Sequence, residues 1–81
     1  MSLRTDVPHR AAAAAYTQLE VLRRVANLCA FGYTIVASTV LINRVRNGDV
    51  DYASIKQALS SYVDQDTYWE VVETVDAIIL E

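Results

Sequence analysis

Apolar residues recur along the first half of the chain at alternating steps of four and three positions. The series consists of Ala12, Ala15, Leu19, Leu22, Ala26, Cys29, Tyr33, Val36 and Val40. This spacing is the a/d pattern that gives a helix one apolar seam for contact with another helix. Thr5 and Asp6 followed by Pro8 are typical of a first helical turn. The pattern therefore predicts a non-helical tail over residues 1–7 and one long helix over residues 8–47.

Gly32 interrupts this predicted helix, because glycine costs about 1 kcal/mol relative to alanine inside a helix. The seam keeps its phase on both sides of Gly32, which favours a bend over two helices joined by a turn. Gly48 is expected to end the helix in a left-handed conformation. Asn47-Gly48 is also a hairpin signal, and residues 34–42 are rich in β-branched side chains, so a strand is the alternative there.

Two shorter amphipathic segments follow Gly48. Tyr52, Ile55 and Leu59 form one apolar stripe, which predicts a second helix over residues 51–63 capped by Asp51. A broader apolar face predicts a third helix over residues 67–80; it contains Tyr68, Val71, Val72, Val75, Ile78 and Ile79. Thr67 and Glu70 have the spacing of a capping box at its start. The predicted fold is all-α: a single helical domain over residues 1–81, in which two shorter helices pack back on the long one as a small bundle.

The hydrophobic content predicts self-association. Of the 81 residues, 53% are hydrophobic, whereas a domain of this size buries only about 60% of its unfolded surface. Because a large exposed apolar patch marks a contact surface, we expect a homodimer or a higher oligomer. The expected interface is the seam, with Leu19, Leu22, Ala26, Cys29, Tyr33, Val36 and Val40.

The charges divide between the two halves of the chain. Residues 1–48 hold six arginines against two acids, which gives +4, and residues 49–81 hold one lysine against eight acids, which gives −7. Opposite charges favour pairing of the halves within one chain or across a dimer. Alternatively, the acidic half meets another, basic protein. The expected partner surface then contains Asp64, Asp66, Glu70, Glu73 and Asp76.

No residue pattern indicates catalysis, a cofactor or a metal ion. The pairs Asp49/Asp51 and Asp64/Asp66 lack the further ligands of a calcium loop, and helix capping explains both. His9 is the only histidine and has no second ligand at a suitable spacing. Cys29 is the only cysteine, which excludes a disulfide within the chain and fits a reducing, cytoplasmic location.

The sequence also bears on two further classes of partner, nucleic acid and membrane. Nucleic acid is disfavoured, since the last predicted helix would turn Glu70, Glu73 and Asp76 towards the phosphates. Residues 25–43 carry no charge and nearly reach the ~20 residues that a membrane span needs.

The sequence therefore predicts a small, non-enzymatic adaptor, regulatory or structural subunit that acts by protein–protein contact. The alternatives are a membrane-associated subunit spanning with residues 25–43 and an acidic inhibitor of a basic, nucleic-acid-binding surface.

Overall fold

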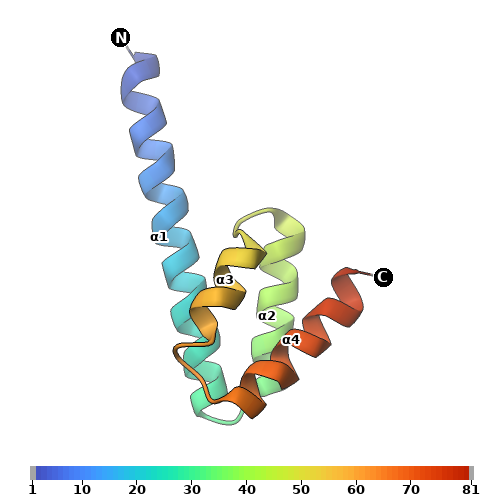
Figure 1. The fold of residues 1–81 in the computed structure, drawn as a ribbon. Coiled ribbons are helices and arrows are strands. Elements are labelled where there is room, and N and C mark those ends of the chain that lie inside the picture. Colours follow the sequence, from blue (N-terminus) through green and yellow to red (C-terminus); the bar gives the residue numbers. More distant parts are fainter. Residues whose placement is uncertain (1, 81) are drawn as a thin grey trace.

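The chain is almost entirely helical. The computed structural model describes the backbone of residues 2–80 and the side chains of residues 14–80. Over this range the chain forms four helices and no strand: α1 (Ser2–Ala30), α2 (Thr34–Asn47), α3 (Tyr52–Leu59) and α4 (Gln65–Ile79). The predicted all-α class is confirmed. Figure 1 shows that α2 runs back along α1, that α3 and α4 pack on this pair, and that the first half of α1 extends beyond the other helices.

The prediction of one helix over residues 8–47 was wrong, because the chain reverses direction at Gly32. This glycine has a left-handed backbone, with φ of 84°. Its N–H donates to the Cys29 carbonyl at 3.0 Å, and the Tyr33 N–H donates to the Leu28 carbonyl at 2.8 Å. These two bonds are the Schellman motif that closes a helix. The reversal lets apolar residues before and after Gly32 bury one another within one chain.

The same motif closes α2 at Gly48, as predicted. Gly48 has φ of 78°, and its N–H donates to the Val45 carbonyl at 3.1 Å. The Asp49 N–H donates to the Arg44 carbonyl at 3.0 Å, and the two side chains form an ion pair at the same distance. The alternative of a strand and a hairpin here was wrong.

The boundaries also differ from the predicted ones for the N-terminal tail and for the second predicted helix. The predicted tail is helical from Ser2, since its residues include no glycine and a strongly helix-favouring alanine run follows; residue 1 lies outside the described residues. The predicted second helix, 51–63, is confined to α3, with Asp51 as its N-cap residue.

The predicted capping box of α4 does not form. Helix α4 begins two residues earlier than predicted, after Asp64, whose backbone is extended and whose carbonyl accepts the Tyr68 N–H at 2.9 Å. Aspartate is a favoured N-cap residue. Glu70 instead accepts a hydrogen bond from the Thr34 hydroxyl at 2.7 Å. The start of α4 is thereby tied to the start of α2.

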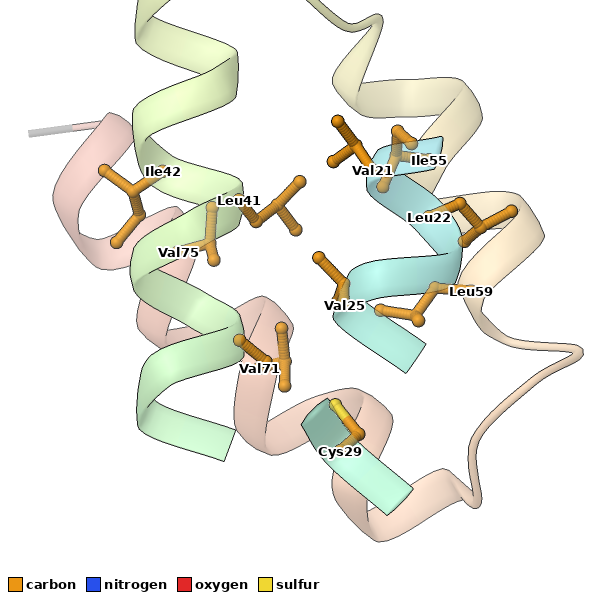
Figure 2. Packing of buried hydrophobic residues seen from close by; sticks show 11 residues of the cluster. Val21, Leu22, Val25, Cys29, Leu41, Ile42, Ile55, Leu59, Val71 and Val75 are labelled. Atoms are coloured by element: carbon orange, nitrogen blue, oxygen red, sulfur yellow. The ribbon is translucent and has the colours of Figure 1, made fainter. Parts of the chain in front are cut away.

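The hydrophobic core takes side chains from all four helices, and Figure 2 shows them converging between the helices. Helix α1 supplies Val21, Leu22, Val25 and Cys29; α2 supplies Ala37, Leu41 and Ile42; α3 supplies Ile55 and Leu59; α4 supplies Val71 and Val75. Each fully buried Val, Leu or Ile stabilises the fold by roughly 1.5–3 kcal/mol. The one buried polar residue among the described side chains, Ser38, donates its hydroxyl to the Thr34 carbonyl at 2.8 Å.

Candidate functional site

The structure divides the seam that was predicted to mediate self-association. Leu22 and Cys29 are buried in the core, and Ala26 and Val40 pack against it. The other three members are exposed: Leu19 by 42%, Tyr33 by 58% and Val36 by 49%. The buried members already have partners inside the chain, because the reversal at Gly32 folds the seam onto itself. Only the exposed members remain available to a second copy.

An apolar surface surrounds the connection between α1 and α2. It consists of Phe31, Tyr33, Ile35 and Val36, and we call it the apolar turn surface. All four side chains are exposed, Phe31 by 77% and Ile35 by 66%. Phe31 and Ile35 were not among the predicted interface residues, because the heptad pattern placed them off the seam. The uncharged run over residues 25–43, with a glycine in its middle, was the signal in the sequence that could have located them.

The acidic residues that were predicted to form a partner surface lie around α4. Asp64, Asp66, Glu70 and Glu73 are exposed, and Asp76 is partly buried. Among the side chains described, over residues 14–80, the one ion pair joins Arg44 and Asp49. Within this range the basic and acidic halves therefore share one ion pair, and the five acids of the predicted surface form none.

A cleft lies between the C-terminal end of α3 and the first turns of α4. It is lined by Ser60, Gln65, Tyr68 and Trp69, and we call it the α3–α4 cleft. The rings of Tyr68 and Trp69 meet edge to face, with centroids 5.3 Å apart and planes inclined by 82°. Trp69 remains 49% exposed. The sequence pattern placed Tyr68 on the apolar face of the last predicted helix but did not bring Tyr68 and Trp69 together in a cleft.

Tyr52 connects α3 to α4 through a hydrogen bond. Its hydroxyl donates to the Asp76 carboxylate, and the Lys56 ammonium lies 4.6 Å from the centroid of its ring. The pKa of Tyr52 lies well above its ordinary value. Burial is the largest cause, and the hydrogen bond to Asp76 is the second. The arrangement favours the neutral phenol, since a phenolate would face the Asp76 carboxylate in a partly desolvated position.

We expect this tyrosine to make stability fall at alkaline pH. Because the pKa of Tyr52 is higher in the folded chain than in the unfolded chain, its contribution is fully present below about pH 10 and is lost as the pH rises above that value. An absorbance titration of phenolate formation should show a late phase that disappears in Tyr52→Phe. A late phase that persists in this variant would contradict the assignment.

Cys29 lies where α1 ends, close to α4. Burial raises the pKa of its thiol, and the carboxylates of Glu70 and Asp64 raise it further. Since the thiolate is the nucleophilic form, this environment keeps the sulfur unreactive at neutral pH. Cys29 acts here as a small apolar core residue.

The comparisons add no relative from which a function could be transferred. No protein-family model matches the chain, and no curated protein or solved structure is significantly similar to it. Within residues 2–80, none of the helices is long and apolar enough to cross a membrane. In the same part of the chain, no group of three or more His, Cys, Asp and Glu side chains is placed to hold a metal ion. The exposed surfaces are therefore the features of this chain that bear on its function.

Proposed function

We propose that this protein is a small, non-enzymatic adaptor, regulatory or structural subunit that acts by protein–protein contact, first with further copies of itself. The observation that supports the proposal is the apolar turn surface. Four large apolar side chains are exposed within six consecutive positions around Gly32. Single exposed apolar residues are common on monomers, but a contiguous patch of aromatic and aliphatic side chains is typical of a contact surface.

The chemistry of this surface suits a second copy. Residues 25–43 contain no charged side chain, so two such surfaces can face each other without burying unpaired charges. In a two-fold dimer the same patch serves on both subunits. Phe31 and Tyr33 would then supply the aromatic contacts that are enriched in interfaces.

Light scattering at micromolar concentration tests this proposal. We expect the protein to have at least twice its chain mass of 9.0 kDa. The double variant Phe31→Ser/Ile35→Ser should shift the mass to that of the monomer and keep its helical circular dichroism, because both side chains are exposed. Leu80→Ser is the control, since Leu80 is 79% exposed and lies on a different helix end.

Two outcomes would contradict the proposal in different ways. A wild-type mass of one chain at all concentrations would exclude self-association. An oligomer that persists in Phe31→Ser/Ile35→Ser would place the interface elsewhere on the molecule.

A second candidate function is an acidic inhibitor that covers a basic, nucleic-acid-binding surface of a target protein. The exposed carboxylates of Asp64, Asp66, Glu70 and Glu73 favour it. Loss of target capture on addition of duplex DNA is the expected result. The membrane-spanning alternative is not retained, since residues 25–43 are divided between α1, a turn and α2.

A further inference from the structure

We propose that the α3–α4 cleft binds an arginine or lysine side chain from a basic segment of a partner protein, with Trp69 as the aromatic surface beneath the cation. This inference rests on the proposed function of protein–protein contact and specifies the chemistry of the partner. Three observations carry it: Trp69 in the cleft is exposed, the cation on α3 is already placed on a different ring, that of Tyr52, and carboxylates stand before and after Trp69 on α4.

Trp69 is held in place but not covered. The edge-to-face contact with Tyr68 fixes the ring, since Tyr68 itself packs against the core. About half of the Trp69 side chain is nevertheless exposed, at 49%. Tryptophan is the strongest cation–π acceptor among the side chains, and Arg is its most frequent partner.

The lysine of α3, Lys56, is already paired with another aromatic ring, that of Tyr52. Lys56 lies four residues before Ser60, the C-cap residue of α3, which places Lys56 one turn from the cleft. Its ammonium sits over the ring of Tyr52. Among the side chains of residues 14–80, this is the one cation found on an aromatic ring. The ring of Trp69 thus remains open to a cation from outside the chain.

Carboxylates flank the tryptophan along α4. Asp66 precedes Trp69 by three residues and Glu73 follows it by four, so all three share one face of the helix. Both carboxylates are exposed, and neither forms an ion pair within residues 14–80. An arginine stacked on Trp69 can also donate to either carboxylate. A neutral or acidic partner would instead desolvate these acids without compensation.

The experiment uses an octa-arginine peptide and the whole protein. Trp69 is the only tryptophan in the chain, so the emission of the protein reports directly on the cleft. We expect a saturable change in emission on titration. The affinity should fall as salt increases, because exposed charges are screened over about 8–10 Å. An octa-glutamate peptide should leave the emission unchanged.

A matched pair of charge reversals separates the cleft from general charge attraction. Glu73→Lys and Glu20→Lys change the net charge equally, and both residues are exposed on helices. We expect Glu73→Lys to weaken octa-arginine binding about tenfold, a loss of roughly 1.4 kcal/mol, and Glu20→Lys to have little effect. Calorimetry should show lost binding in Trp69→Leu and partial recovery in Trp69→Phe, with helical circular dichroism preserved.

Equal losses in Glu73→Lys and Glu20→Lys, or unchanged binding by Trp69→Leu, would overturn the proposal. So would the absence of any saturable response to octa-arginine. Light scattering on the same samples distinguishes this failure from that of the proposed function. An oligomer that does not bind the peptide would refute only the cleft, whereas a non-binding monomer would also refute self-association.

Discussion

Replacing Leu22 by aspartate is expected to unfold the protein. Leu22 is 7% exposed and lies in the core cluster that joins the helices. Truncation of a buried leucine to alanine costs roughly 2–5 kcal/mol, and a carboxylate adds the penalty of burying an unpaired charge. This sum approaches the whole stability of a small domain, which is about 5–15 kcal/mol. Circular dichroism with urea denaturation measures the loss.

Leu19→Asp is the matched control for this variant. Leu19 precedes Leu22 by one turn of α1, belongs to the same predicted seam, and is 42% exposed. We expect Leu19→Asp to stay folded. Its loss in the free energy of unfolding should be much smaller than the loss in Leu22→Asp. The heptad pattern alone would instead make Leu22→Asp a folded protein that no longer associates. A folded monomer of Leu22→Asp would support that pattern and contradict the core described above.

Replacing Gly32 by valine is expected to produce the second large effect. The backbone of Gly32 has φ of 84°, a conformation that β-branched residues rarely adopt. An added Cβ would meet no atom within 4 Å, so the loss comes from the backbone and not from crowding. We expect the free energy of unfolding to fall by roughly 1–3 kcal/mol.

Gly32→Asn is the control variant for Gly32→Val. It separates the cost of backbone strain from any cost of replacing glycine at this position. Asparagine tolerates the left-handed region far better than valine, so Gly32→Asn should keep most of the stability that Gly32→Val loses. Thermal or urea unfolding compares the two variants. Equal stability of Gly32→Val and the parent would show that the chain does not turn at this residue.

The apolar pattern was sufficient to predict the helices but not the path of the chain. The stripe of Ile55 and Leu59 and the broad face of α4 are local features, and both were recognised as helical. Ile55 and Leu59 are buried, as are Val71, Val72 and Val75 of the broad face, whereas Ile78 remains 37% exposed. Gly48 was identified as a helix end because Arg44 and Arg46 precede it and the pair Asn47-Gly48 favours a left-handed closing residue. Gly32 has no such neighbours, and a seam that continues in phase is equally compatible with a helix and with a hairpin.

The candidate surfaces depend on that path. Leu22 and Cys29 have the spacing of interface residues, yet the reversal at Gly32 supplies their partners from the same chain. Phe31 and Ile35 are exposed because they lie at the reversal itself. Helix α4 returns along α2, where Thr34 and Glu70 are hydrogen-bonded across 36 positions of sequence. Contacts of this kind are set by tertiary packing and leave no periodic signal.

The distance between spin labels at Arg23 and Asn43 tests the central claim, the reversal at Gly32, most directly. Both residues are exposed, and Cys29→Ala removes the remaining thiol. In the structure, Glu20, Val21 and Arg24 of α1 line one pocket together with Val40 and Arg44 of α2. The two labels should therefore be separated by little more than the helix spacing of about 8–10 Å plus their tethers. An excess of unlabelled protein suppresses distances between chains. A separation near 30 Å, the span of 20 residues in a continuous helix at about 1.5 Å each, would contradict the account.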